Sequence, residues 1–356
     1  MSLEIRRASC IKDRQEMLDL LERNLGASQE QRFNWRHSEN PAGDSWSWFV
    51  HEPGRPAAVG LASVFPRHMW VDRKQVTAGQ VGDFVIDSTY RSLGPAVLLQ
   101  RTTFEPVDSG KIAFCYDCPP HDRGMSTFVR LGMVSNCDVL RYALLLRSDE
   151  YFLKKLGKHL WTKPLVGATN VFLAIRKSST ALKGLEISEF NDNFGEEFSQ
   201  LDRRLAASGE VRASRSAEDM NWRYRKDPLR KRHLSKGDVG TYRVLVARKA
   251  GELLAFVIFF IQTDGIAYIV DLFGVEISKI AAPLLSAVRE ISYASKVWAI
   301  WAFCSTDSEL NSIFQEARFY RRELSVRTVA YAPASEIVGR PGSGLRWPFS
   351  HVEVLQ

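Results

Sequence analysis

One short pattern in this chain has the residue types needed to bind an anion with backbone groups. Residues 91–96 read Arg-x-x-Gly-x-Ala and follow an apolar run that predicts a buried strand. Glycine lets a ligand approach the backbone closely, and proline suits the first position of a helix. We therefore expect a strand, a turn and a helix whose first amide groups face an anion such as a pyrophosphate. The residues assigned to this site are Phe84, Val85, Ile86, Arg91, Ser92, Leu93, Gly94, Pro95 and Ala96.

The segment that follows predicts two further strands with a helix between them. Lys111 to Cys115 is short, apolar and aromatic, as expected of a buried strand. A helical pattern from Arg123 to Leu131 ends at Gly132, which we expect to be a left-handed C-terminal cap. A strand from Val139 to Leu146 comes next. The strands that end at Val85 and begin at Lys111 are predicted to be parallel neighbours that separate, and ligands bind beyond the carboxyl ends of such strands.

Together these features resemble the acyl-CoA-binding region of the GNAT acyltransferase superfamily. Its usual motif is Gln/Arg-x-x-Gly-x-Gly/Ala at the start of a helix, and residues 91–96 match it. Members also have a later helix that closes on a Leu-Gly-Phe-like tripeptide, which Leu131-Gly132-Met133 matches. The resemblance implies an acyl-CoA co-substrate, a primary amine acceptor and no metal. It also places Phe128, four residues before Gly132, beside the cofactor, where the family often has a tyrosine that protonates the departing thiolate.

Proton transfer is where the sequence departs from that family. Phenylalanine cannot donate a proton, so water or a nearby group must do so, or the thiolate leaves unaided. The amine must also lose a proton, and we expect a backbone N–H near Phe84 to Ile86 to stabilise the oxyanion. Asp83 lies on the predicted buried strand, where desolvation is expected to raise its pKa. The candidate bases are Asp83, Asp87, His37 and Glu39, and the candidate acids are Ser126, Tyr116 and Cys118.

An internal repeat runs through the chain. Asn34-Trp35-Arg36, followed by a proline five residues later, recurs as Asn221-Trp222-Arg223, an offset of 187 residues (221 minus 34). Asp83 has a counterpart in Asp271, and residues 129–133 correspond to residues 315–319. A period this long indicates two similar domains rather than a solenoid. The order of strands and helices predicts an α/β fold with mixed sheets in two tandem GNAT-like units, residues 1–146 and 185–356, with a connecting segment at 147–184.

The second unit lacks the anion-binding pattern. Its corresponding turn begins with Glu276 and has no Gln/Arg-x-x-Gly-x-Gly/Ala sequence. A carboxylate at that place would repel a diphosphate. We predict that this unit binds no CoA and instead closes the acceptor pocket or supports the first unit.

Composition is ordinary for a globular protein. The chain is 45% hydrophobic and 25% charged, and it shows neither a signal-peptide core nor an apolar run of membrane-spanning length. A cytoplasmic location is therefore predicted. The odd number of cysteines, five in a large chain, favours reduced thiols. Cys115-x-x-Cys118 has no second such pair, so we interpret it as two small buried residues rather than as a metal or redox site.

The net charge of +7 suits an anionic partner. Basic residues gather between Trp222 and His233, where they could bind phosphate, an acidic glycan, lipid head groups or an acidic acyl carrier protein. We favour a solvated loop for this segment. No nucleic acid is predicted as a partner, because such proteins show a broader basic face with interleaved aromatic residues.

The predicted function is an N-acyltransferase that moves an acyl group, acetyl in the first instance, from acyl-CoA to a primary amine. An amino sugar or another cell-envelope precursor is the suggested acceptor, by association with tandem bacterial proteins of the resembled superfamily. One alternative is a non-catalytic acyl-CoA-binding or regulatory module, which Phe128 favours. Another is a peptidoglycan-type aminoacyl-tRNA-dependent transferase, which should carry a helical-hairpin insertion that we do not find. The oligomeric state is left open.

Overall fold

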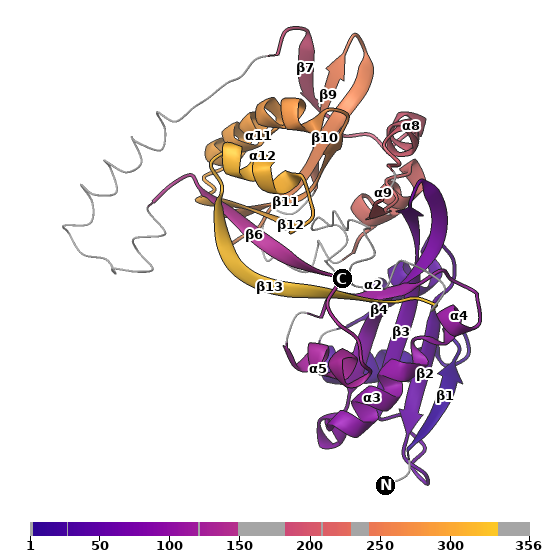
Figure 1. The fold of residues 1–356 in the computed structure, drawn as a ribbon. Coiled ribbons are helices and arrows are strands. Elements are labelled where there is room, and N and C mark those ends of the chain that lie inside the picture. The colour runs from indigo at the N-terminus through magenta and orange to yellow at the C-terminus, as the bar shows by residue number, and fades with distance from the viewer. Residues whose placement is uncertain are drawn as a thin grey trace, which may run out of the picture.

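The structure, a computed structural model, describes residues 3–26, 28–119, 122–148, 182–207, 209–228 and 242–333. These residues form two lobes, each a sheet with helices packed against it (Figure 1). The predicted α/β class with a mixed sheet is therefore confirmed. None of the helices in these ranges is long and apolar enough to cross a bilayer.

The first lobe contains most of the first half of the chain. The strands of this half are β1 (Glu4–Ala8), β2 (Trp46–His51), β3 (Gly60–Val71), β4 (Lys74–Ile86), β5 (Cys115–Asp117) and β6 (Cys137–Leu145). Of these, β6 lies in the sheet of the second lobe. The helices of this half are α1 (Arg14–Leu25), α2 (Glu30–Phe33), α3 (Leu93–Thr102), α4 (Glu105–Asp108) and α5 (Asp122–Arg130). A π-helical turn, η1 (Asn34–Ser38), continues α2, and a 3-10 turn, η2 (Ser88–Tyr90), precedes α3.

The second lobe repeats this order. Its strands are β7 (Leu185–Glu189), β8 (Val211–Ala213), β9 (Arg243–Lys249), β10 (Glu252–Ile261), β11 (Ile266–Gly274), β12 (Ala299–Ser305) and β13 (Tyr320–Tyr331). Its helices are α8 (Glu196–Arg204), α9 (Ala217–Tyr224), α11 (Ile277–Ala294) and α12 (Leu310–Glu316). The predicted amphipathic stretch at 151–161 lies outside the described residues.

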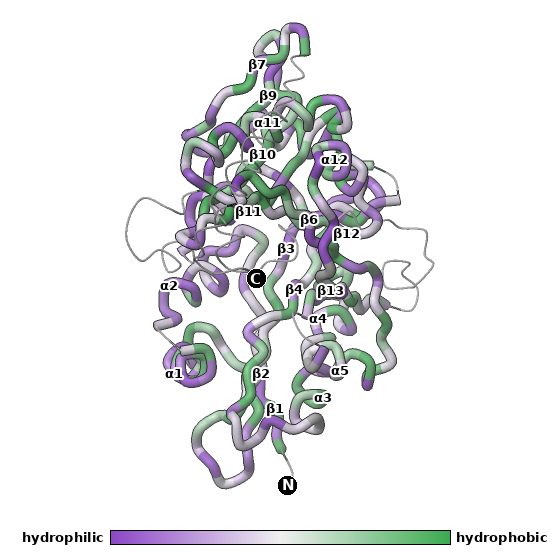
Figure 2. The backbone as a smooth tube through the Cα atoms, turned by 90° about the vertical axis from the view of Figure 1, so that its left-hand side faces the viewer, coloured by the Kyte–Doolittle hydropathy of each residue, from purple (hydrophilic) through white to green (hydrophobic). Residues whose placement is uncertain are grey.

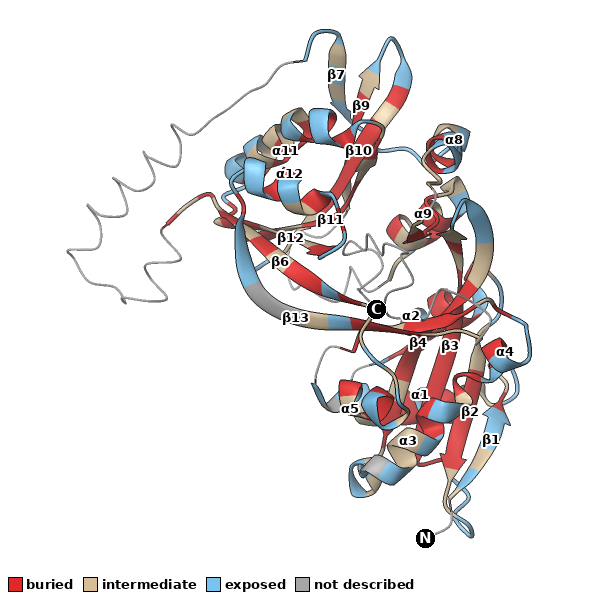
Figure 3. Cartoon of the chain, viewed as in Figure 1, coloured by how far each residue is buried: buried red, intermediate tan, exposed pale blue. Residues whose placement is uncertain are grey.

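The helices cover the sheets through apolar faces. In the first lobe, α1 and α2 lie on one side of β1–β4, and α3, α4 and α5 lie on the other (Figure 2). Apolar residues three or four positions apart fall on one face of a helix. On α1 such a face buries Met17, Leu18, Leu20 and Leu21. The central strands are accordingly buried along most of their length, whereas the edge strands β1 and β7 are partly exposed (Figure 3).

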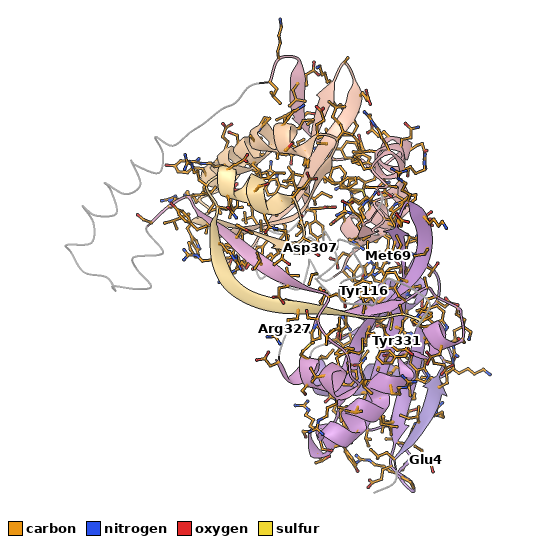
Figure 4. The ribbon with its side chains drawn as sticks, in the orientation of Figure 1. Glu4, Met69, Tyr116, Asp307, Arg327 and Tyr331 are labelled. Carbon is orange, nitrogen blue, oxygen red and sulfur yellow. The ribbon has the colours of Figure 1, made fainter. Side chains whose placement is uncertain are left out.

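The two lobes exchange their last strands. The strand order is β1-β2-β3-β4-β5-β13-β6-β12-β11-β10-β9-β7, with β8 paired to β3. Strand β6, from the first half, pairs with β12, and β13, from the second half, pairs with both β6 and β5. The end of β13, at Tyr331, therefore lies in the first lobe (Figure 4). The proposed division at 146 and 185 stays a prediction, and these strands pair across it.

The two halves have the same backbone conformation at corresponding positions after α5 and after α12. Gly132 has φ +79°, which confirms the predicted left-handed cap, and its counterpart Arg318 has φ +66°. The next residue in each half donates the same backbone hydrogen bond. Met133 N–H donates to Phe128 at 3.0 Å, and Phe319 N–H donates to Phe314 at 2.8 Å.

The repeated Trp residues meet each other. The Trp35 and Trp222 rings stack with centroids 4.6 Å apart and planes 17° apart. Each indole N–H also donates to the other tryptophan's backbone carbonyl at 2.9 Å. Both residues are buried, as expected for core anchors. The strongest element of the sequence repeat is thus a symmetric contact between the halves.

Other residues of both halves complete this junction. Met69 on β3 packs in one apolar cluster with Val211 and Ala213 of β8, and β3 pairs with β8 there. Met69 and Tyr116 lie near the junction of the lobes, far from Glu4 (Figure 4). His68 Nδ1 lies 3.0 Å from Asp219 Oδ1 across the same boundary. The halves are therefore joined by apolar, hydrogen-bonded and charged contacts.

Three boundary predictions were wrong. The strand predicted from Lys111 is β5, which begins only at Cys115, because the chain first makes the short helix α4 and a turn. The strand predicted to begin at Val139 is β6, which begins two residues earlier, at Cys137. Helix α3 begins at Leu93, so Pro95 is its third residue rather than its first.

Replacing Trp35 with Phe removes one indole donor and leaves the buried Trp222 carbonyl without it. We expect urea unfolding to show a loss of about 1–3 kcal/mol for Trp35→Phe and a similar loss for Trp222→Phe. Because the two rings contact each other, the double variant should lose less than the sum. Trp298→Phe is the control, since that indole also donates to a carbonyl, Asp264, but at an exposed turn within one half. An additive double variant would contradict direct coupling.

Candidate functional site

Strands β4 and β5 separate where the sequence predicts a ligand site. They are parallel, as predicted, and pair at Gly79 with Cys115 and at Gln80 with Tyr116. Strand β4 then continues to Ile86, beyond the last paired position with β5. From Phe84 to Ile86, β4 pairs only with β3 among the described strands, and backbone amides on such an edge can bind a ligand.

Strand β4 bulges within this separated segment. Asp83 has φ +49°, and the pairing of β3 with β4 shifts register between Leu61 and Ser63 opposite it. This left-handed conformation is unusual for any residue except glycine, although aspartate tolerates it better than most. A bulge re-aims the strand beside it. The bulge therefore lies directly between the last β4–β5 pair and the predicted anion site.

The start of α3 is open. Ser92 is the N-cap residue in an extended conformation, and no side chain caps the helix. Arg91, Ser92 and Gly94 are exposed. A Cβ atom added at Gly94 would meet nothing within 4 Å. The space beside Gly94 is thus open, as an anion site at this helix start would require.

Side chains at this turn fix its shape. Arg91 Nε donates to the Ile86 carbonyl at 2.9 Å, and its Nη2 donates to Asn24 Oδ1 at 3.1 Å. Asp87 accepts from Arg23 Nε and Nη2 at 3.0 Å and from Asn24 Nδ2 at 2.9 Å. Burial alone would raise the pKa of Asp87, but these hydrogen bonds from Arg23 and Asn24 lower it. Asp87 is therefore tied to α1 and caps no turn with its side chain.

Asp83 lies in a buried cluster of charges. Its carboxylate pairs with Arg32 and, at 3.1 Å, with Arg36 Nη1. His37 Nε2 lies 3.1 Å from Asp83 Oδ2, and His37 Nδ1 lies 2.6 Å from Ser45 Oγ. The side chains of Asp83 and His37 have no exposed surface. The structure therefore brings together two predicted bases, Asp83 and His37, away from solvent.

The expectation that Asp83 has a raised pKa was wrong. Burial alone would raise it, but the guanidinium groups of Arg32 and Arg36 and the His37 hydrogen bond together hold the pKa well below its usual range. Burial lowers the pKa of His37 despite the nearby carboxylate, so this ring is neutral at pH 7. A carboxylate so strongly stabilised as an anion is a weak proton acceptor.

The other predicted site residues lie elsewhere. Phe128 is 2% exposed and packs in the apolar core beneath α3 and β4, so its ring is part of that core. Cys115 and Cys118 are buried and form no disulfide with each other, and burial raises the pKa of the Cys115 thiol well above its usual value because the thiolate is costly to bury. Glu39 is exposed and lines a surface hollow with Trp35, Arg225 and Lys226.

The basic segment begins on α9 and continues over residues 225–228 in a partly exposed loop, as we favoured. Trp222 and Tyr224 are buried on α9 and contribute to the core rather than to an aromatic face. Arg225 and Lys226 line the surface hollow at the junction. Residues 229–233 of this segment lie outside the described residues.

Several charged residues that lie near β4 in the structure were not predicted as site residues from the sequence. Arg32 lies four residues before Arg36, a spacing that places both on one helical face, so a carboxylate partner could have been expected. Arg67 on β3 reaches diagonally to Gln80 on β4, donating to Gln80 Oε1 at 2.6 and 3.0 Å. Nothing in the sequence indicates that pair, because it depends on the register of two strands.

In the second lobe, the helix start that corresponds to residues 91–96 is that of α11, and it differs from the start of α3. Glu276, with φ +44°, is the N-cap residue of α11 and pairs with Lys279 at 3.2 Å. Asp271, the counterpart of Asp83, pairs with Arg215 through Nε at 2.9 Å. The carboxylate at the bulge position is thus paired in both halves. That the second unit binds no CoA stays a prediction.

Comparisons with known proteins agree on the fold. No protein-family model matches the chain, and no curated protein matches its sequence. A GCN5-related N-acetyltransferase from Anabaena variabilis superimposes with a TM-score of 0.63 at 14% identity, over 93% of this chain and 73% of that chain. A conserved protein of unknown function from Enterococcus faecalis, described as a probable N-acyltransferase, has a TM-score of 0.63 at 12% identity, over 93% and 72%.

The similarity extends over both lobes. Saccharomyces cerevisiae N-myristoyltransferase with bound myristoyl-CoA superimposes with a TM-score of 0.57 at 13% identity, over 100% of this chain and 89% of that chain. The chain therefore has the GNAT fold, as its motifs predicted, and both of its lobes take part in the match.

Replacing Asp83 with Asn should test whether its main role is structural. The substitution leaves Arg32 and Arg36 buried without their counter-charge, so we expect a loss of about 3–5 kcal/mol in urea unfolding. Asp87→Asn is the control, because its partner Arg23 is largely exposed, and we expect a loss of about 1 kcal/mol or less. Equal losses in the two variants would contradict the structural role.

The contact of His68 with Asp219 should make the junction sensitive to pH. The hydrogen bond to Asp219 raises the pKa of His68 above the value of about 6.5 that is usual for histidine. Its contribution to stability is therefore fully present below about pH 6.5 and is lost as pH rises through the folded-state pKa. Urea unfolding at pH 5.5 and pH 8.5 should show a larger fall for the wild type than for His68→Asn. Identical falls would contradict this.

Proposed function

We propose that this protein is an acyl-CoA-dependent N-acyltransferase whose donor site lies between β4, β5 and the start of α3. The proposal rests on one observation. Strand β4 separates from β5 after Gln80 and bulges at Asp83. It then leads to the start of α3, at residues 91–96, where no side chain caps the helix. The GNAT fold supports it, since the matched Anabaena protein is described as an N-acetyltransferase and the yeast enzyme holds myristoyl-CoA.

The donor would lie along β4. Its pyrophosphate would accept hydrogen bonds from the N–H groups of Leu93 and Gly94 at the start of α3. The N–H groups of Ser92 and Ala96 donate to the Tyr90 and Ser92 carbonyls, and Pro95 has no N–H to donate. Arg91 lies one residue before this cradle and adds positive charge to it. The thioester would then reach the unpaired edge at Phe84, Val85 and Ile86, where a backbone N–H can stabilise the developing oxyanion.

The reaction requires few side chains. A neutral amine attacks the thioester carbonyl, the C–N bond forms and the C–S bond breaks. The nitrogen loses its extra proton to water, and the thiolate takes a proton from water, so the products are the amide and the free thiol of CoA. Asp83 and His37 are buried and paired, so their role in this proposal is to position the β4 bulge. Glu39 is exposed and is the remaining carboxylate among the four candidate bases. The proposed donor is acetyl-CoA in the first instance, and an amino sugar or cell-envelope amine stays the suggested acceptor.

A bulky residue at Gly94 should block the donor without disturbing the fold, because the space above Gly94 is empty. Isothermal titration with acetyl-CoA should show binding to the wild type and at least about tenfold weaker binding to Gly94→Trp. Gly195→Trp is a matched control, since Gly195 stands at the start of α8 and also has nothing within 4 Å of an added Cβ.

The titration tests the donor site, and a second assay tests whether the protein is an enzyme. Equal binding to the Gly94→Trp variant, or no binding to the wild type, would refute the donor site. Release of free thiol with a panel of primary amines then separates an enzyme from the alternative, a non-catalytic acyl-CoA-binding module. Tight binding of acetyl-CoA with no amine-dependent thiol release would favour the module, which the buried Phe128 at the usual acid position also favours.

A further inference from the structure

Three buried guanidinium groups gather beside the proposed donor site. Arg36 and Arg67 are 1% and 7% exposed, and the side chain of Arg32 is 13% exposed. Arg36 lies over the Phe65 ring with its Cζ 3.9 Å from the centroid, and Arg67 lies over the Trp222 ring at 4.5 Å. Phe65 and Arg67 are two residues apart on β3 and so lie on one face of the sheet.

Several N–H donors in this cluster have no acceptor. Among the described residues, these are Nη1 of Arg32, Nε and Nη2 of Arg36, and Nη1 of Arg67. Arg67 donates its other N–H groups only to the uncharged side chain of Gln80. Buried polar groups normally have partners, so such a concentration of unused donors indicates an acceptor that is not part of the described chain.

The charges in the cluster do not balance. Three guanidinium groups are accompanied by one directly paired carboxylate, that of Asp83. Burial lowers the pKa of Arg36 to about 9 and that of Arg67 to about 10, so both remain cationic at pH 7. Two further carboxylates act on the cluster from a distance, Asp219 on Arg67 and Asp227 on Arg36. Asp219 already pairs with His68 and accepts from Ser216.

The arginine cluster lies beside the row of residues at which β4 and β5 last pair. Gln80 is the cross-strand partner of Phe65 on one side and of Tyr116 on the other. That row is the last at which β4 pairs with β5 before β4 bulges and continues alone. An anion held by Arg67 and Arg36 would therefore lie at the point where the strands separate, next to the expected thioester.

We propose that Arg67 and Arg36 bind a carboxylate of the acceptor, so that the amine acylated by this protein is one that also carries a carboxylate group, as an amino acid does. This rests on the proposed acyltransferase function. A carboxylate accepts forked hydrogen bonds from guanidinium groups, and it offsets the cost of burying their charge. Arg67 then determines which amines are accepted and is not itself a reacting group.

Acetate is a probe small enough to test the anion site without any activity. In the wild type, acetate should raise the thermal midpoint in a saturable manner at constant ionic strength, and acetamide should not. In Arg67→Met the acetate effect should be lost. The midpoint of this variant without acetate should equal or exceed that of the wild type, because a buried unpaired charge has been replaced by an apolar side chain.

A matched control separates this effect from a change in net charge. Arg243→Met also removes one guanidinium, at the partly exposed pair with Glu189, and should keep the full acetate response. An acetate response that is absent in the wild type, matched by chloride, or unchanged in Arg67→Met would overturn the proposal. The wild-type titration decides this even if the variant does not fold.

Activity gives a second readout if acyl transfer is observed. The wild type should acylate a free amino acid at least about tenfold faster, in kcat/KM, than the same amino acid amide. In Arg67→Met this ratio should fall toward one, mainly through KM, while acetyl-CoA affinity stays unchanged. A wild type that prefers the amide would overturn the carboxylate site but leave the acyltransferase function standing. A wild type that binds no acetyl-CoA would refute the function, and the acetate titration would still test the site.

Discussion

The reciprocal contact of Trp35 and Trp222 is the interaction on which the rest of this structure depends. Each indole stacks on the other and donates to the other's backbone carbonyl at 2.9 Å. Tryptophan is the side chain that combines such a ring with an N–H donor at its edge. The contact fixes η1 against α9, and η1 carries Arg36 and His37, which hold Asp83 at the bulge of β4. The geometry of the candidate donor site therefore depends on a contact between the two halves.

The exchanged strands explain why a half without the anion-binding motif is nonetheless needed. Strand β13 pairs with β5, and β6 pairs with β12, so each half completes the sheet of the other. The second half has Glu276 at the helix start where the first half has an open turn. In our interpretation, one half keeps the donor site, and the other supplies the strand and the tryptophan that hold it in place.

Charge is distributed unevenly at the junction. The carboxylates that looked like catalytic bases are used for structure, since Asp83 binds Arg32 and Arg36 and Asp87 binds Arg23. Arg67, by contrast, has no directly paired carboxylate among the described residues and packs on Trp222. Burying a cation in this way costs free energy that a folded protein normally recovers elsewhere. An anionic substrate group is the acceptor we propose, which links the charge imbalance to the choice of acceptor.

The sequence alone determined the fold class, the repeat, the parallel β4–β5 pair and the helix start at residues 91–96, because each depends on periodicity or on residues close together in the chain. It also gave the left-handed cap at Gly132, since a glycine after a helix needs only local geometry. Only the tertiary structure decided the exchange of β6 and β13, the lowered pKa of Asp83 and the unused donors of Arg67. Those features arise from strand register and from contacts between residues far apart in the chain, such as the pairing of β3 with β4 and of β13 with β5, and no local pattern specifies such partners.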